Sequence, residues 1–195
     1  MIINIAIFAS GSGSNAENLI EKFKDHPFIR IKLIVTNNPT AGVIERAKRL
    51  KKTVHIISKK ALTNYTNQII DFLKSEEINM IVLAGFLLKV PKELITAFPH
   101  HIINIHPALL PKYGGKGFYG SHVHQAVIDN KESESGITIH YVNEEYDEGQ
   151  IILQEKCSVT PTDTPETLAN KIHELEYIYF PVAVEKIANK LLMEK

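Results

Sequence analysis

Two polar segments carry side chains whose types and spacing could assist a reaction at a carbonyl group. Asn104 and His106 close an apolar run and lie two positions apart, which places them on one face of a strand. A histidine exchanges its proton near neutral pH, and an asparagine can donate an amide N–H to a developing oxyanion. One carboxylate of the acidic loop 143–149 near His106 is expected to stabilise its imidazolium and raise its pKa, and Asp147 of this loop could also order a water for proton transfer. The alternative is a structural histidine and a solvated hairpin turn.

A glycine-rich turn near the start of the chain is the second candidate site. Ser10-Gly11-Ser12-Gly13-Ser14-Asn15 lies between an apolar run and a helical pattern. Glycines let a ligand approach the backbone N–H groups, and the start of a helix offers free donors and a positive dipole end. The segment therefore favours phosphate binding. The structural alternative is a plain strand-to-helix turn in which Ser14 caps the helix and Glu17 completes a capping box.

The same turn fits the dinucleotide pattern G-x-G-x-x-A only loosely, through Gly11, Gly13 and Ala16. That interpretation needs a carboxylate at the end of the second strand to hold the ribose, and Val35-Thr36-Asn37-Asn38 offers none. A triphosphate-binding loop would need Gly-Lys-Ser or Gly-Lys-Thr, which is missing. A single phosphate on a small molecule is the preferred ligand.

The elements that must position these residues alternate along the first part of the chain. Buried strands are expected over 2–9, 31–35, 54–57, 80–84 and 102–105, and apolar residues repeat at helical spacing over 15–24, 43–50 and 69–73. Strands that are apolar on both faces require cover on both sides, which indicates a parallel sheet between helices. Ligands bind beyond the carboxyl ends of such strands, where His106 lies.

The second half changes character. Residues 136–143 alternate and 151–155 can pair with them, which predicts an antiparallel hairpin that extends the sheet. Thr164-Pro165-Glu166 opens a long terminal helix, and Pro181 should kink or interrupt it. The predicted fold class is α/β, a Rossmann-like three-layer sandwich whose mostly parallel sheet ends in an antiparallel C-terminal hairpin. We expect one domain over residues 1–195.

Composition narrows the class of protein. The 195 residues are 44% apolar and carry 22 basic and 22 acidic side chains. The sequence has no basic run or patch, which argues against nucleic acid as a partner. No apolar run approaches a membrane-spanning length, and the N-terminal segment is interpreted as a buried strand rather than a signal peptide. Cys157 is the single cysteine, so an intrachain disulfide and a thiolate metal cluster are excluded. We expect a cytoplasmic enzyme that acts on small-molecule substrates as a monomer or homodimer.

Four ordered segments resemble one family. Asn104-Ile105-His106-Pro107-Ala108-Leu109-Leu110-Pro111-Lys112-Tyr113 resembles the signature of the formyltransferases that use 10-formyltetrahydrofolate, and its Lys112-Tyr113 ending is similar to the branch acting on phosphoribosylglycinamide. Segments 8–15, 82–86 and 136–142 with Asp147 agree, and together they cover nearly the whole chain.

The resemblance implies a role for each matching residue. Asn104, His106 and Asp147 would be catalytic. Gly13, Ser14 and Asn15 would bind phosphoribosylglycinamide, with the phosphate on the helix start, and Glu176 would contact this substrate from the terminal helix. The formyl donor, 10-formyltetrahydrofolate, would be the co-substrate, and no metal is implied. The folate pocket would comprise Leu87, Leu88, Lys89, Val90, Asn104, Asn143, Glu144, Glu145, Tyr146 and Asp147.

Several departures and alternatives stay open. Leu88 stands where the family often has arginine, and Lys89 follows it. The glycine-rich stretch 114–120 is a mobile lid or a passive connector, and the Leu110–Pro111 bond could be cis. For His122 and His124, which follow this stretch, we expect structural roles at the start of a helix. A formyltetrahydrofolate hydrolase, whose chains usually carry an extra N-terminal domain, and a phosphate-ligand-binding module without catalysis are the alternative functions.

Overall fold

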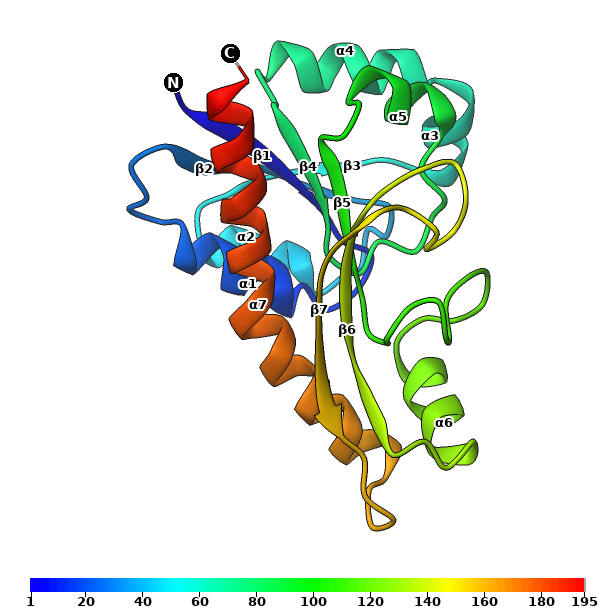
Figure 1. The fold of residues 1–195 in the computed structure, drawn as a ribbon. Helices are drawn as coiled ribbons and strands as arrows, with labels where there is room; N and C mark the ends of the chain where they lie inside the picture. Colours follow the sequence, from blue (N-terminus) through cyan, green and yellow to red (C-terminus); the bar gives the residue numbers. More distant parts are fainter. Residues whose placement is uncertain (195) are drawn as a thin grey trace.

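A seven-stranded sheet forms the middle layer of the computed structural model, which describes residues 1–194 (Figure 1). The strand order is β3-β2-β1-β4-β5-β6-β7. Pairing is parallel through β5 and antiparallel from β5 to β7, which confirms the predicted fold class. The strands are β1 (Ile3–Phe8), β2 (Ile29–Thr36), β3 (Thr53–Ile56), β4 (Met80–Leu83), β5 (Ile102–His106), β6 (Glu134–Tyr141) and β7 (Ile151–Ser158).

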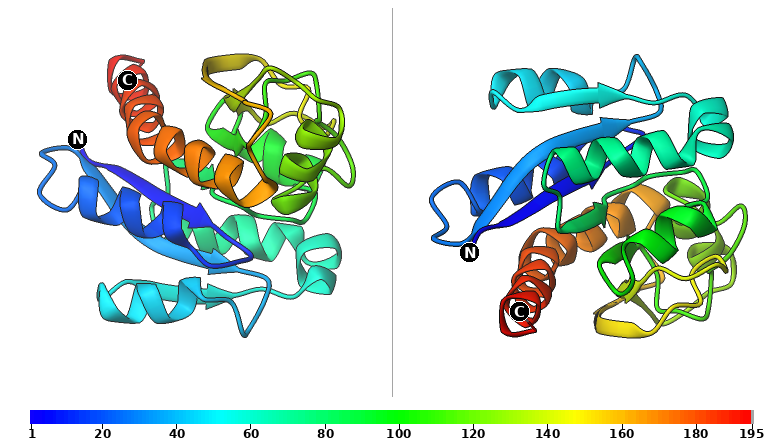
Figure 2. Two further views of the ribbon diagram at one scale, coloured as in Figure 1. Left: turned by 90° about the horizontal axis from the view of Figure 1, so that it is seen from below. Right: turned by 90° about the horizontal axis from the view of Figure 1, so that it is seen from above.

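Helices cover both faces of the sheet (Figure 2). Ile5 and Ile7 of β1 join one apolar core with residues of α1 (Ser14–Lys22), α2 (Val43–Arg49) and α7 (Pro165–Met193). Ala6 and Phe8 face the other core, formed with α3 (Lys59–Asn64), α4 (Thr66–Ser75) and α5 (Lys92–Ala97). The two helical patterns expected over 15–24 and 43–50 correspond to α1 and α2, and the pattern over 69–73 lies inside α4. In addition, α6 (Ser121–Asp129) packs against α7.

The terminal helix begins as predicted but does not end at Pro181, although a proline inside a helix often ends it. Thr164 caps α7 in a capping box with Thr167, and Pro165 follows in the first turn. The helix then runs through Pro181, so the predicted interruption is absent. A proline leaves the carbonyl four residues earlier without its helical donor, and here Asn18 of α1 donates to the Tyr177 carbonyl at 3.0 Å. The neighbouring helix supplies the missing bond.

The turn after β5 is fixed by a buried threonine of β6. The Thr138 hydroxyl accepts from the Leu110 N–H at 3.0 Å and donates to the Ala108 carbonyl at 2.7 Å. Gln154 of β7 reinforces both contacts, and the Leu110–Pro111 bond is cis, the isomer that the sequence left open. This bracing holds the end of β5 in place. No helix within residues 1–194 is long and apolar enough to cross a membrane.

Candidate active site

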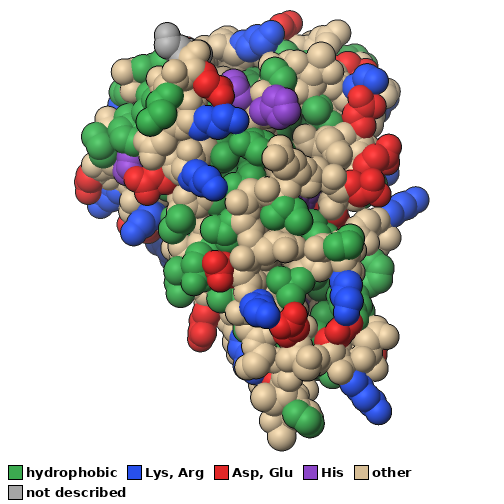
Figure 3. Space-filling model, viewed as in Figure 1, with side chains coloured by type: hydrophobic (Ala, Val, Ile, Leu, Met, Phe, Trp, Pro, Cys, Tyr) green, Lys and Arg blue, Asp and Glu red, His purple; other side chains and the backbone are tan. Residues whose placement is uncertain are grey.

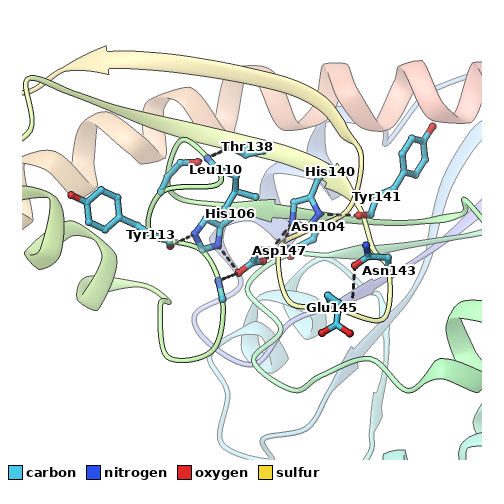
Figure 4. A network of polar contacts seen from close by, with 12 residues as sticks. Asn104, His106, Leu110, Tyr113, Thr138, His140, Tyr141, Asn143, Glu145 and Asp147 are labelled. Atoms are coloured by element: carbon cyan, nitrogen blue, oxygen red, sulfur yellow. Dashed lines mark hydrogen bonds and ion pairs between the residues drawn. The ribbon is translucent and has the colours of Figure 1, made fainter.

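Asn104, His106 and Asp147 lie together at the carboxyl end of β5 (Figure 4). The loop between β6 and β7 folds back so that the Asp147 Oδ2 is 3.6 Å from the His106 Nδ1. The Asn104 Nδ2 donates to the Asp147 Oδ1 over 3.4 Å. The structure therefore brings together the three side chains that the sequence singled out from distant segments.

A fourth polar side chain, His140 of β6, belongs to the same cluster and was not among the predicted site residues. It is the register partner of Asn104 across the antiparallel β5–β6 ladder, and its side chain is on the same face of the sheet. The His140 Nε2 is 3.1 Å from the Asn104 Nδ2 and 3.6 Å from the Asp147 Oδ1. The alternation of residues 136–143 was visible in the sequence, but the register that sets His140 opposite Asn104 was not.

Backbone groups of the segment after β5 form hydrogen bonds with His106 and Asp147. The His106 Nε2 donates to the Tyr113 carbonyl at 2.7 Å, and the Gly115 N–H donates to the Asp147 Oδ2 at 2.9 Å. Because a carbonyl oxygen can only accept, the Nε2 of His106 carries a proton. In the neutral ring, the Nδ1 of His106 then presents a lone pair to Asp147.

Burial determines the charge state of His106. Loss of hydration lowers its pKa below the ordinary 6.5, although Asp147 and the Tyr113 carbonyl act in the opposite direction. Asp147 thus raises this pKa, as expected, but burial outweighs it, so the expectation that the carboxylate keeps the ring charged is wrong for the protein without its substrates. Burial also opposes the charge on Asp147, but the contacts with His140, His106 and the Gly115 N–H outweigh it. The pKa of Asp147 lies below the ordinary 3.8, and the carboxyl is ionised at neutral pH.

The cluster opens into a cavity of about 550 Å³. At its other end lies the glycine turn, where Gly13, with φ 78°, precedes the first residue of α1 and no side chain caps the helix. The capping box proposed as the structural alternative is absent, because Glu17 pairs instead with Arg46 and Arg49. The backbone donors at the start of α1 therefore have no side-chain cap to compete with an anion. The walls come from residues 11–15, 84–87, 104–107, 115–120, 124, 146–147, 172, 173 and 176.

Glu176 of α7 faces the glycine turn from the opposite wall. Its carboxylate is buried, and its Oε2 accepts from the Asn15 Nδ2 at 2.9 Å and lies 2.9 Å from the His173 Nδ1. The hydrogen bond to Glu176 raises the pKa of His173, against the effect of burial. His124, for which a structural role was expected, is buried in the cavity wall, and its Nδ1 has no hydrogen-bond partner, whereas His122 is exposed.

The predicted folate residues divide into two groups. Leu87, Tyr146 and Asp147 line the cavity together with Asn104. The Lys89 ammonium lies 5.4 Å from the centre of the Tyr146 ring, and Lys92 pairs with Glu144 at 2.9 Å, so the two loops of the proposed pocket are neighbours. The other predicted side chains do not line the cavity: Leu88 and Val90 pack in the core, and Lys89, Asn143, Glu144 and Glu145 lie outside it.

The glycine-rich stretch forms part of the wall. Residues 115–120, including Phe118 and Tyr119, border the cavity. The sequence alone could not decide whether this stretch is a lid or a connector.

Basic and acidic side chains are interspersed over the molecular face in Figure 3. Among residues 1–194, no group of three or more His, Cys, Asp or Glu side chains has the arrangement of a metal site.

Comparisons with known proteins agree with one another. The sequence profile of the formyl transferase family matches residues 3–184. The phosphoribosylglycinamide formyltransferase of Bacillus subtilis is 34% identical over 186 residues, which are 93% of this chain and 93% of that protein. A crystal structure of the phosphoribosylglycinamide formyltransferase from Bacillus halodurans superposes with a TM-score of 0.87 and 37% identity, covering 96% of each chain.

Plant relatives are longer. The chloroplastic phosphoribosylglycinamide formyltransferase of Arabidopsis thaliana is 40% identical over 184 residues, which are 91% of this chain and 63% of that protein. The chain likewise covers 62% of the Vigna unguiculata protein of the same name. It thus spans a little under two thirds of the length of these relatives.

Proposed function

The chain belongs to the formyl transferase family, and from this premise we propose that it transfers the formyl group of 10-formyltetrahydrofolate to the amine of phosphoribosylglycinamide. The observation that carries the proposal is the composition of one cavity. An uncapped helix start suited to phosphate lies at one end, and a cluster suited to carbonyl chemistry lies at the other. This activity belongs to the synthesis of purines.

The phosphorylated substrate binds, in this proposal, between α1 and α7. The N–H groups of Gly13, Ser14 and Asn15 and the dipole of α1 hold the phosphate, because that helix start is free of side-chain caps. Glu176 contacts the sugar from the facing helix, where its carboxylate is already oriented by Asn15. The amine then extends toward His106.

The reaction exchanges one bond at the formyl carbon. The amine nitrogen attacks this carbon, negative charge develops on the formyl oxygen, and the bond to the folate nitrogen breaks. The amine loses one proton and the folate nitrogen gains one. We propose that Asn104 and the Nε2–H of His106 stabilise the oxygen, with the formyl oxygen replacing the Tyr113 carbonyl as acceptor. Each such donor typically contributes about 2.7–4 kcal/mol.

We propose that His106, assisted by Asp147, carries the proton that the amine loses to the folate nitrogen. In the neutral ring, the Nδ1 lone pair faces the Asp147 Oδ2 across 3.6 Å. A proton taken up at this Nδ1 is attracted by the carboxylate, which stabilises the imidazolium for as long as it exists. The proton then passes, directly or through a water, to the folate nitrogen. These steps use side chains and water, so we expect a chelator to leave the rate unchanged.

The heterocycle of the formyl donor lies, in this proposal, between the loops after β4 and β6. Leu87 and Tyr146 supply apolar walls. For Leu88, Lys89, Val90, Asn143, Glu144 and Glu145 we propose backbone contacts with the folate, because their side chains point elsewhere. We further propose that the chain works in the cytoplasm as a monomer or homodimer on small molecules; its single cysteine suits a reducing compartment.

The test mixes the purified chain with 10-formyltetrahydrofolate and phosphoribosylglycinamide. Loss of the formyl group is followed by the absorbance change of the folate, and the formylated product by mass spectrometry. We expect one product molecule for each tetrahydrofolate, and no reaction without the amine. Formate release at the same rate with and without the amine would indicate a hydrolase, and no turnover with any amine would indicate a binding module. Either result would refute the proposal.

A further inference from the structure

We propose that His140 is a positioning residue for the reaction: its Nε2 holds the Asn104 carboxamide with an N–H directed at the reacting carbonyl. This inference rests on the proposed function of the site. It concerns a residue buried in the sheet, with only 2% of its surface exposed, which lies behind the groups that would meet substrate. His140 acts only through Asn104 in this proposal.

The argument begins with the other nitrogen of the ring. The His140 Nδ1 lies 2.9 Å from the carbonyl oxygen of Tyr141, and because that oxygen can only accept, the proton of the neutral ring must be on Nδ1. The Nε2 of His140 is then a bare acceptor. A hydrogen bond to the backbone thus determines which tautomer faces the active site.

The packing around the Tyr141 carbonyl favours this arrangement. Gly149 lies so close to it that a Cβ at this position would be 1.6 Å from the Tyr141 oxygen and 3.3 Å from the His140 Nδ1. Any side chain at position 149 would displace the loop from this carbonyl. The glycine therefore lets the β6–β7 connection cover the acceptor that fixes the ring.

The bare Nε2 in turn fixes the orientation of the Asn104 amide. The Asn104 Nδ2 lies 3.1 Å from the His140 Nε2, within hydrogen-bond range, whereas the Asp147 Oδ1 is 3.6 Å from the same Nε2, beyond it. If the amide were rotated by half a turn, its oxygen would face a lone pair of His140 and a carboxylate of Asp147. Both contacts would be repulsive, so only one orientation is stable.

This orientation leaves one N–H for catalysis. The Asn104 amide has two hydrogens: one is held by His140, and the other points toward Asp147 over a long 3.4 Å contact. The contact of the second hydrogen with Asp147 is long, so a developing oxyanion can compete for this hydrogen while the first keeps the group in place. Without the His140 acceptor only the long contact with Asp147 would orient the amide, and the oxyanion would meet a donor only part of the time.

A matched pair of variants separates the acceptor from the bulk of the ring. His140→Asn can keep the contact with the Tyr141 carbonyl but has no atom at the Nε2 position. His140→Gln, longer by one methylene, can place its oxygen there. We expect kcat to fall at least tenfold in His140→Asn with KM changed less than threefold, and His140→Gln to stay within threefold of the parent chain. Equal kcat values in the two variants would overturn the proposal.

A double-mutant cycle shows through which group His140 acts. In an Asn104→Ala background, His140→Asn should cost nothing further, because the amide that it orients is already gone. Additive losses would overturn the proposal, and so would a loss that disappears only in an Asp147→Asn background. Ile139→Val, at the adjacent position of β6 with its side chain on the opposite face, serves as the packing control and should retain kcat.

A measurement without turnover keeps this inference separate from the proposed function. In ¹⁵N-labelled protein, the Asn104 carboxamide gives two proton signals, which are assigned by their loss in Asn104→Ala. We expect two well-separated signals in the parent chain and in His140→Gln, and a shifted or broadened pair in His140→Asn. Unchanged signals in His140→Asn would refute the positioning role even if formyl transfer is confirmed. If formyl transfer fails, these signals still test the hydrogen bond.

Discussion

Replacing Asp147 by asparagine removes one negative charge from the cluster and changes little else. Asp147 has φ 57°, a left-handed backbone conformation that aspartate and asparagine tolerate better than most residues. The amide oxygen of the new side chain can still accept from the Gly115 N–H, which now donates to the carboxylate at 2.9 Å. Any loss of activity in Asp147→Asn therefore reports the charge rather than the fold of the loop.

The expected loss follows from the distance between the carboxylate and the ring. Asp147 is 3.6 Å from the His106 Nδ1. Two unit charges about 4 Å apart attract each other by about 4 kcal/mol at the effective dielectric of a protein surface. A hydrogen bond to the amide returns about 1 kcal/mol. The imidazolium formed during proton transfer should thus lose about 3 kcal/mol, which corresponds to a decrease in kcat of roughly a hundredfold.

The assay is initial-rate kinetics with both substrates, and the control is Glu148→Gln, an exposed carboxylate one position further along. We expect kcat to fall in Asp147→Asn, KM for the phosphorylated amine to stay within about threefold, and Glu148→Gln to match the parent chain. Thermal melting checks that both variants are folded. A folded Asp147→Asn with kcat within threefold of the parent would contradict the proposed role of the carboxylate.

Three further predictions test other parts of the structure. Asn15→Ala should raise KM for the phosphorylated amine about tenfold with a smaller effect on kcat, because it removes the amide that orients Glu176, and an unchanged KM would count against substrate binding between α1 and α7. By NMR titration, the His106 ring should have its midpoint below 6.5, since burial lowers its pKa; a midpoint at or above 6.5 would refute this account. Because burial lowers the pKa of His106 in the folded state, the stability contributed by its neutral ring is fully present above pH 6.5. This stability is lost as the pH falls from 6.5 through the lowered pKa of the folded state. In urea melts, Gly136→Ala should lower the free energy of unfolding by more than about 2 kcal/mol, because its Cβ would lie 2.0 Å from the Glu155 carbonyl oxygen, while Gly11→Ala, with open space around it, should change it by less than about 0.5 kcal/mol.

The central strands β1 and β4 were predictable because they are continuous apolar runs. β1 is buried at all six positions and β4 at all four, so each strand shows as an apolar run in the sequence. The helices α3 and α5 were not predicted. Each has six residues and one buried side chain, Leu62 in α3 and Leu94 in α5, which is too little to establish a helical period. The continuation of α7 through Pro181 was not predictable, because the compensating donor, Asn18, lies in another helix.

The candidate site was predictable where a local pattern sets direction. Alternation along β5 put Asn104 and His106 on one face, whichever strand paired with it. His140 depends on the register between β5 and β6, and a shift of one residue would have turned it to the opposite face. The contact between Asn15 and Glu176 joins residues 161 positions apart, and only the packing of α1 on α7 brings them together. The pKa of His106 depends on how deeply its ring is buried, which no spacing in the sequence reveals.

Under the proposed function, two carboxylates in one cavity would repel a phosphorylated substrate, and each carboxylate lies beside histidines. Asp147 lies between the rings of His106 and His140, and Glu176 is bonded to His173. Around Asp147 both rings are held by backbone carbonyls, which orients the His106 ring for the proposed proton transfer and the His140 ring toward Asn104. At Glu176 the raised pKa of His173 favours a charged ring, which cancels the carboxylate beside the start of α1. The proposed phosphate would there meet the helix dipole and a carboxylate that is already paired with a histidine. The pKa of His106 is lowered by burial and that of His173 is raised by its carboxylate, which suits the two tasks proposed for this cavity, proton transfer at His106 and acceptance of an anion at the start of α1.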